Sequence, residues 1–247
     1  MPGMQLDTAS PHNRVRAFPP AHASPPSAAH DSFKLLGTDY TIRFADHCEL
    51  LRTRTSELVE RLYAHRGLYA SHAHATRQAG QTTLAACDAG GQVFGTLTLG
   101  LDGATGLLAE SLYGPQIDAV RRAGGRVCEV TRLAMDPARS SNEAIARLFH
   151  LTFILARLVH GMTDLFIEVH PRHSAFYRRM LGYREAGPEC ICPRVGAPAV
   201  LLHLPLHDAE QRIRARGSDR SLYRLFMSED EQRALAERLL CPTTLLS

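Results

Sequence analysis

The chain has 247 residues, is 45% hydrophobic and carries a net charge of +3, which fits one α/β domain with additional segments. No apolar run approaches the length of a membrane span, so the composition excludes an integral membrane protein and predicts a soluble one. Lys34 is the only lysine, so nearly all basic residues are arginine, the better partner for phosphate and carboxylate groups. We expect no nucleic-acid partner.

Residues 1–33 are rich in proline, alanine, serine and histidine and show no hydrophobic periodicity, which predicts a disordered leader. They contain neither the apolar segment nor the amphipathic arginine face of a targeting peptide. The six cysteines are therefore expected to stay reduced in the cytoplasm. Cys190 and Cys192 lack a second pair of ligands, so we expect no metal site.

The first half of the chain predicts strands and helices in alternation. Residues 40–45 form a plausible strand, and leucines at helical spacing predict a helix over 46–63. Two β-rich runs, 82–88 and 92–99, flank a glycine turn and predict a hairpin. A short helix is expected over 115–122, because proline is tolerated at a first helical position.

The central stretch begins with an alternating run over 127–135, which predicts a strand that Asp136-Pro137 ends. Ser140-Ser141-Asn142-Glu143 has the S-x-x-E pattern of a capping box, so a helix should begin at Ser141 or Asn142. Apolar residues then recur at helical spacing until Gly161.

The stretch continues with a short β-rich run over 164–169, and Pro171 opens a helix that should end at Gly182. A last strand over 198–204 is expected to lie next to Ile167. Residues 207–247 predict a basic helical extension, with a second S-x-x-E pattern at Ser228.

The segment from Val127 to Tyr183 resembles the core of the GCN5-related N-acyltransferase fold. Within it, Glu129-Val130-Thr131-Arg132 is similar to the E-x-[ST]-R motif of acyl-homoserine-lactone synthases. A wider run over about 40–206, including IEVHPRHSAFYRRMLGY, is similar to the long-chain N-acyl amino acid synthases. The resemblance implies an α/β (α+β) fold: a mixed, mostly antiparallel sheet with splayed central strands and flanking helices.

This resemblance implies a catalytic domain over 34–206, followed by the extension over 207–247. The implied reaction moves a long-chain fatty acyl group from acyl carrier protein to the amine of an amino acid. No bound cofactor is expected, since the donor is the acyl-phosphopantetheine of the carrier, with acyl-CoA as the alternative. Peripheral membrane contact would serve release of the product.

Amide formation from a thioester requires a polarised carbonyl, a deprotonated amine and a protonated leaving thiolate. Glu129 is the candidate base, because burial in an apolar strand raises the pKa of a carboxylate. The alternative is an ion pair with Arg132, although strict alternation places these two side chains on opposite faces. Thr131 and Arg132 are expected at the acceptor site by resemblance.

The carbonyl is expected to meet backbone N–H groups near Leu133, Ala134 and Met135, released by a bulge in the strand. By resemblance, Tyr177 is expected to protonate the thiolate. His173, four residues earlier on the same helix face, is the alternative donor. A packed tyrosine with a satisfied hydroxyl is the purely structural interpretation.

The acceptor carboxylate is assigned to Arg66 by resemblance, with Tyr69 lining the pocket; a surface arginine on a loop is the alternative. Ser141, Asn142 and His170 are assigned to the donor arm, His170 standing where the related synthases have asparagine. The loop 138–144 contains no glycine, unlike loops whose amides approach the diphosphate of CoA, and this favours carrier protein over free CoA. Exposed arginines could face the acidic carrier.

Three other functions remain open. An ordinary CoA-dependent GCN5-type N-acetyltransferase would bind CoA and ignore carrier protein. An acyl-homoserine-lactone synthase is disfavoured because the chain has no tryptophan, which those enzymes usually place near the acceptor. A non-catalytic binder of acyl chains or carrier protein would bind without turnover.

Overall fold

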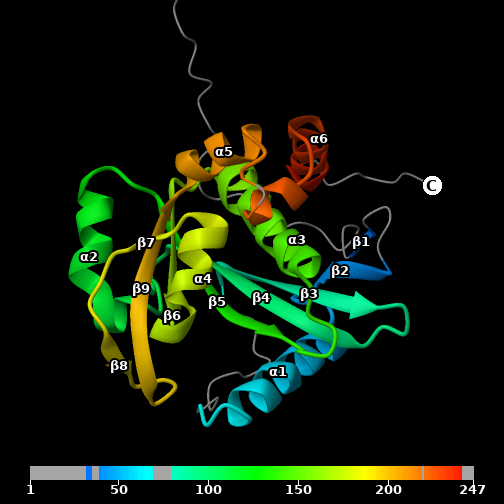
Figure 1. Ribbon diagram of the computed structural model, residues 1–247, viewed down its shortest axis with the longest axis horizontal. Helices are drawn as coiled ribbons and strands as arrows, with labels where there is room; N and C mark the ends of the chain where they lie inside the picture. The colour runs from blue at the N-terminus through cyan, green and yellow to red at the C-terminus, as the bar shows by residue number, and fades with distance from the viewer. Residues whose placement is uncertain (1–31, 35–38, 69–78, 219, 241–247) are drawn as a thin grey trace, which may run out of the picture.

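The computed structural model describes residues 32–34, 39–68, 79–218 and 220–240. These form a sheet with the strand order β1-β2-β3-β4-β5-β6-β9-β7, and β8 pairs with β9 (Figure 1). The strands are β1 (Ser32–Lys34), β2 (Tyr40–Phe44), β3 (Gln81–Asp88), β4 (Val93–Leu101), β5 (Val127–Met135), β6 (Asp164–Val169), β7 (Arg184–Glu185), β8 (Cys190–Cys192) and β9 (Ala197–Pro205). Strands β5 and β6 are parallel and the other paired neighbours are antiparallel, which confirms the predicted sheet.

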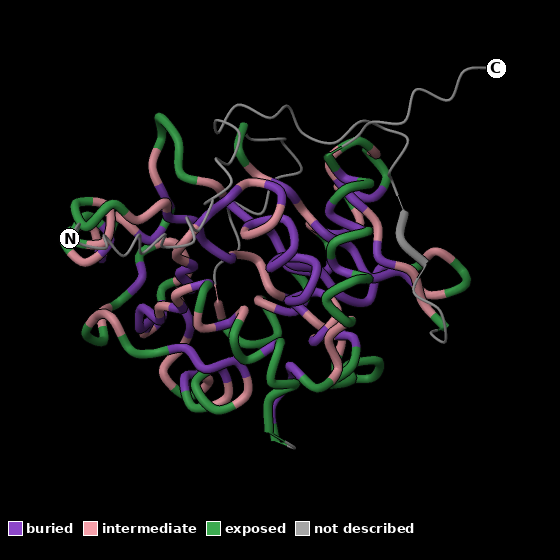
Figure 2. Tube along the Cα trace, turned by 90° about the horizontal axis from the view of Figure 1, so that it is seen from above, coloured by how far each residue is buried: buried purple, intermediate pink, exposed green. Residues whose placement is uncertain are grey.

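Helices cover both faces of the sheet. Leu58 of α1 packs with Ala85 and Ala134, and Tyr113 of α2 packs with Phe166, on one face. The main apolar cluster lies on the other face, beneath α3, α4 and the C-terminal helices, and Figure 2 shows the buried residues running through the centre. The helical elements are α1 (Glu49–Ala64), α2 (Glu110–Arg122), α3 (Asn142–Phe153), η2 (Ile154–Val159), α4 (Pro171–Leu181), α5 (Leu206–Arg214), η3 (Leu222–Leu225) and α6 (Glu229–Leu240).

Several helix ends follow the signals in the sequence. Pro171 lies at the first turn of α4, and Gly182 ends that helix in the left-handed conformation with φ 78°. The Ser228 amide and hydroxyl each donate to Glu231 at 2.8 Å, and the Glu231 amide returns a bond to the Ser228 hydroxyl. This is the predicted reciprocal capping box.

Helix α3 begins at Asn142, as predicted, but with a different cap, whereas the predicted start of α2 was wrong. The hydroxyl of Ser141, not that of Ser140, caps α3, because it accepts from the Ala144 amide at 3.0 Å. Helix α2 begins at Glu110 rather than at Pro115, and the backbone is kinked at Tyr113 (φ −127°) just before the proline. Pro115 therefore opens only the second part of α2, where its missing N–H costs little.

Candidate active site

Strands β5 and β6 separate after a short parallel ladder. The pairing runs from Val127 opposite Asp164 to Val130 opposite Ile167. Beyond this point β5 continues along β4, whereas β6 continues along β9. Among the described residues, β5 therefore forms no ladder with β6 beyond Val130. A strand edge of this kind presents backbone N–H and C=O groups towards the opening.

A bulge lies in β5 at the same place. Thr131 is opposite Thr98 and Ala134 is opposite Thr96, so one residue of β4 faces two of β5. Arg132 adopts φ 52°, the left-handed conformation that accommodates the extra residue. Ala134 then packs with the α1 cluster, while Leu133 and Met135 pack on the other face. The bulge expected near Leu133 to Met135 is confirmed, one residue earlier than that range.

Glu129 lies on the face of β5 that α2 covers, immediately before the separation. Its side chain is 4% exposed, and its two carboxylate oxygens accept from the amides of Leu108 at 2.7 Å and Ala109 at 3.1 Å. Gly100 lies directly opposite, where an added Cβ would be 3.3 Å from Glu129 Cγ. Burial raises the pKa of Glu129 above 4.5, although the two amide bonds and Arg194 act to lower it. A buried carboxylate of this kind can accept a proton nearer neutral pH.

The hydrogen bonds of the Glu129 carboxylate go to backbone amides, not to Arg132, the ion-pair partner considered as the alternative. The carboxylate is bonded by backbone amides at the start of α2, which the sequence did not indicate. A negative charge is favourable at that helix end.

Arg194 links β6 to the start of α2 and was not predicted. Its guanidinium donates to Glu168 of β6 at 2.8 Å, to the Leu108 carbonyl at 2.6 Å and to the Ser111 hydroxyl at 2.8 Å. It thereby fixes the segment whose amides bind Glu129. The signal was weak, because Arg194 lies in a turn between β8 and β9 where an arginine is usually a solvated side chain.

A second set of polar side chains lies near the opening and comes from the end of α1, from β5 and from α4. Burial raises the pKa of Tyr63, and the charges of Arg66 and Arg132 act to lower it. Arg66 acts in the same sense on Tyr177, whose pKa burial likewise raises. The structure therefore brings Arg66, Arg132 and Tyr177 to one region, with Tyr63 as an additional hydroxyl that the sequence analysis missed.

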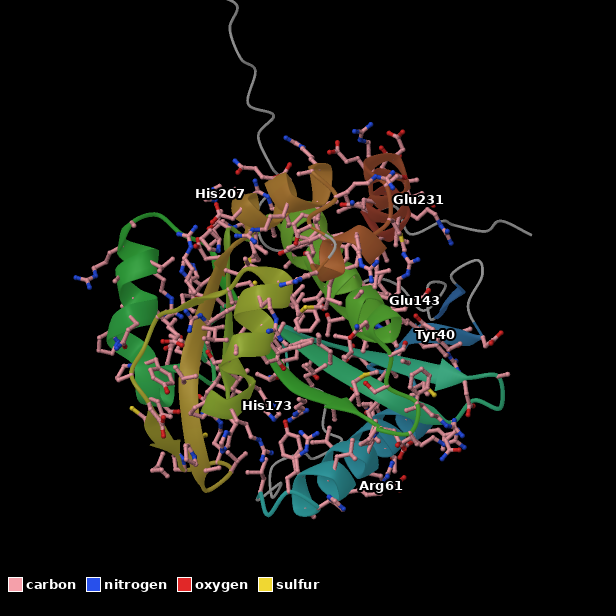
Figure 3. The ribbon with its side chains drawn as sticks, viewed as in Figure 1. Tyr40, Arg61, Glu143, His173, His207 and Glu231 are labelled. Carbon is pink, nitrogen blue, oxygen red and sulfur yellow. The ribbon has the colours of Figure 1, made fainter. Side chains whose placement is uncertain are left out.

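His173 lies in the first turns of α4, on the side that faces α1 (Figure 3). Its pKa is lowered by burial and then by the charges of Arg172, Arg66 and His170. Its Nε2 accepts from Arg172 Nε at 3.1 Å, so the proton of the neutral ring is on Nδ1. His170 caps α4, with Nδ1 accepting from the Arg172 amide at 3.2 Å. These contacts orient both imidazoles.

Tyr177 and Glu129 belong to opposite faces of the sheet. Tyr177 is packed in the main cluster against Phe149 and Tyr183, whereas Glu129 faces α2. Only where β5 and β6 have separated can groups from both faces approach one substrate. A base on one side and a proton donor on the other would suit a thioester held in the opening.

The remaining candidates are more distant from this group. Ser141 and Asn142 are exposed at the start of α3, after the loop that follows β5. Tyr69 lies outside the described residues. No group of three or more His, Cys, Asp or Glu side chains able to hold a metal occurs in the described ranges, and no helix there is long and apolar enough to span a membrane. The five described cysteines are free thiols.

A sheet with this order, in which β5 and β6 separate, has the GCN5-related N-acyltransferase fold. The chain belongs to the family described as N-acyl amino acid synthase FeeM, whose model matches residues 54–205, more than half of the chain. It is an N-acyltransferase.

Several solved structures are similar to this chain. The structure of FeeM, an N-acyl amino acid synthase from uncultured soil microbes, is 26% identical with a TM-score of 0.64, covering 72% of this chain and 96% of its own. A putative N-acetyltransferase from Lactobacillus plantarum shares the fold at 17% identity and a TM-score of 0.51, covering 68% and 99%. The acyl-homoserine-lactone synthase LasI also matches, at 17% identity and a TM-score of 0.45, covering 69% and 91%. A comparison with curated proteins gave no match.

Proposed function

We propose that the protein transfers a long-chain fatty acyl group from acyl carrier protein to the α-amine of an amino acid in the cytoplasm. The observation that carries this proposal is the separation of β5 from β6 directly beyond Glu129. A thioester arm lying along the free edge of β5 would present its carbonyl to the strand's backbone amides. The product, an N-acyl amino acid, joins one charged head to an apolar chain and would therefore also contact membranes.

In the proposed reaction the Glu129 carboxylate takes a proton from the ammonium group of the acceptor. The amine nitrogen attacks the thioester carbon, and amides of the β5 edge stabilise the negative oxygen. The carbon–sulfur bond then breaks, and Tyr177 or His173 gives its proton to the departing thiolate. The same group takes up the second proton that the nitrogen loses as the amide forms, so the products are the amide and the free thiol. The raised pKa of Tyr177 keeps its hydroxyl protonated until that step.

The acceptor would be held by its carboxylate. Arg66 and Arg132 are the candidates, because both act electrostatically on Tyr63 near the opening. Thr131 follows Glu129 on the same face and is half-buried. An arginine fork binds a carboxylate with two parallel hydrogen bonds, which would also aim the amine.

Carrier protein is favoured over CoA by the loop that precedes α3. Residues 138–141 of this loop are exposed and contain no glycine, so the close approach of backbone to a diphosphate is not provided for. Glu143, in the first turn of α3, adds a negative charge there.

Mass spectrometry of lipids from cells expressing the protein tests this function. Wild-type cells should accumulate acyl amides whose masses identify both acyl chain and acceptor. Glu129→Gln should lower their amount by about 10²–10⁴-fold, as expected for loss of a general base. Glu189→Gln, the same change at an exposed carboxylate, should leave it unaltered. Acyl amides unchanged in the Glu129→Gln cells would contradict the role of Glu129, and their absence from wild-type cells would contradict the function.

A further inference from the structure

The C-terminal extension forms one wall of a cavity at the start of α3. The cavity has a volume of about 390 Å³ and is lined by Asn142 of α3, by the end of α4 and by the segment around η3. Residues of η3 lie beyond 54–205, the part that matches the family. The lining residues are Asn142, Arg179, Met180, Arg220, Ser221, Leu222, Arg224 and Leu225.

Among the residues that the structure describes, three arginines and no acidic side chain line this cavity. Arg179, Arg220 and Arg224 are exposed, and within the described part of the chain none of them has an ion-pair partner. The neighbouring Arg178 and Arg214 do, since they pair with Glu185 and Glu210 at 2.8 Å. Asp219 lies outside the described residues. Three uncompensated guanidinium groups around one hollow are suited to a multiply bonded anion.

The position of the cavity relates it to the acyl donor. Asn142 begins the helix that follows β5, so the cavity lies beyond the end of the strand whose free edge would hold the thioester arm. The opposite end of a pantetheine arm carries a phosphate. The loop before α3 lacks glycine, so side chains must provide the donors that backbone amides provide elsewhere.

We propose that this arginine-lined cavity binds the phosphate at the end of the donor's pantetheine arm. The inference rests on the proposed function and adds a site that the C-terminal extension completes. Arg220 and Arg224 come from the extension and Arg179 from the catalytic core, so the phosphate joins the two parts. The Ser221 hydroxyl is not available for the anion, since it donates to the Met180 carbonyl at 3.2 Å.

Acylation kinetics with three donors that share one acyl chain test the proposal: acyl carrier protein, acyl-CoA and acyl-pantetheine, which has no phosphate. The test variant is Arg220→Gln/Arg224→Gln. The matched control is Arg233→Gln/Arg238→Gln, which removes the same charge from exposed positions on α6 outside the cavity. The test variant should raise KM for phosphate-bearing donors about tenfold or more with kcat little changed, because charge-assisted hydrogen bonds are lost. Its KM for acyl-pantetheine should stay at the wild-type value.

A rise in KM for both acyl carrier protein and acyl-CoA supports the phosphate contact. A rise for acyl carrier protein alone overturns it, because acyl-CoA carries the same phosphate, and places the arginines against the carrier's own surface. An unchanged KM overturns the proposal, and so does an equal rise for acyl-pantetheine or in the control variant. If the wild type acylates no amine from any donor, the proposed function fails. Calorimetric titration with phosphopantetheine then tests whether the cavity binds the phosphate. Binding by the wild type that the test variant loses supports the proposal, and no binding by the wild type overturns it.

Discussion

The surroundings of Glu129 hold its carboxylate in place and still allow the proposed role as a base. Both oxygens accept backbone amides at the start of α2, which orients the carboxylate and offsets part of the cost of burying it. Each oxygen keeps a second lone pair, so bonding to α2 does not prevent proton transfer. Arg194, bridging Glu168 and the Leu108 carbonyl, fixes these amides from the far side.

The raised pKa of Glu129 predicts a particular pH profile. The base must be ionised, so kcat/KM should rise with pH through the folded-state pKa of Glu129, above its ordinary 4.5. Glu129→Gln should lose this limb along with most activity. The free energy of unfolding should change in the opposite direction to the rate. The folded state binds this proton more tightly than the unfolded chain does, so the stability that protonation contributes is complete below pH 4.5 and is lost as the pH rises through the folded-state pKa. A rate profile measured beside urea unfolding at each pH checks both; a limb that persists in the variant would assign it to another group.

His150 predicts a loss of stability in acid. It is 0% exposed, its Nδ1 accepts from the Met227 amide at 3.1 Å, and its ring stacks on Phe226. Burial, and then the charge of Arg147, lower its pKa from 6.5 to about 3. The imidazole of the unfolded chain therefore becomes protonated below pH 6.5, whereas that of the folded protein becomes protonated only near pH 3. This group's contribution is complete above pH 6.5 and declines by up to about 1.4 kcal/mol per pH unit between these values.

The comparison for His150 is His150→Phe. This variant should lose about 1–3 kcal/mol at pH 8, because the Met227 amide is left without its acceptor. Its unfolding free energy should then fall less steeply than that of the wild type from pH 6.5 downward. Chemical denaturation at a series of pH values measures the difference, and parallel curves would mean that His150 does not contribute to the acid response.

Among the secondary-structure elements, local signals in the sequence predicted the strand bounds and helix ends that depend on nearby residues. Strands β5 and β6 have the expected bounds, and the Gly182 and Ser228 signals end and begin helices as expected. The resemblance supplied the separation of the strands. The partners of Glu129 could not be predicted, because the amides of Leu108 and Ala109 lie about 20 residues away in the sequence and meet the carboxylate only in the tertiary fold.

Substitutions at Arg132 can distinguish the role of the bulged backbone from the role of the guanidinium group. Arg132 is at φ 52°, where a glycine is about 1 kcal/mol less strained. Arg132→Gly should therefore retain the bulge and most of the stability while losing the guanidinium. Arg132→Val should be the less stable of the two by about 1–2 kcal/mol, because a β-branched residue resists this conformation. Thermal unfolding ranks the variants, and KM for the acceptor in Arg132→Gly reports on the side chain; a wild-type KM would remove Arg132 from the acceptor site.

For the whole molecule, the extension is part of the same apolar cluster as the catalytic core. Leu206, Ile213, Tyr223 and Leu235 are buried there together with residues of α3 and α4, and α6 lies against η2. The predicted boundary between the catalytic domain and the extension, at residue 206, stays a prediction. The apolar core continues across this position, because residues on both sides of it belong to one cluster.

Because the extension packs into the core, a substitution in α6, outside the catalytic domain, should strongly lower the free energy of unfolding. Leu235→Ala should cost about 2–5 kcal/mol, because it leaves a cavity in the shared cluster. Leu240→Ala, at a leucine of the same helix that is 43% exposed, should cost under about 1 kcal/mol. Urea denaturation followed by circular dichroism compares them. Equal, small losses would show that α6 does not share in the cooperative unit.

The extra residue in β5 also constrains how relatives of this chain can change length. Side chains in a strand alternate between faces, so deleting one residue between Val127 and Thr131 would exchange the two sets on one side of the deletion. Glu129 would then turn into the apolar layer beneath α3, or Leu133 would turn towards α1. Loss of Arg132 or Leu133 would instead remove the bulge and leave both faces in register, because these two residues oppose one residue of β4. Insertions and deletions should therefore accumulate in the connections before and after β5 or at the bulge itself.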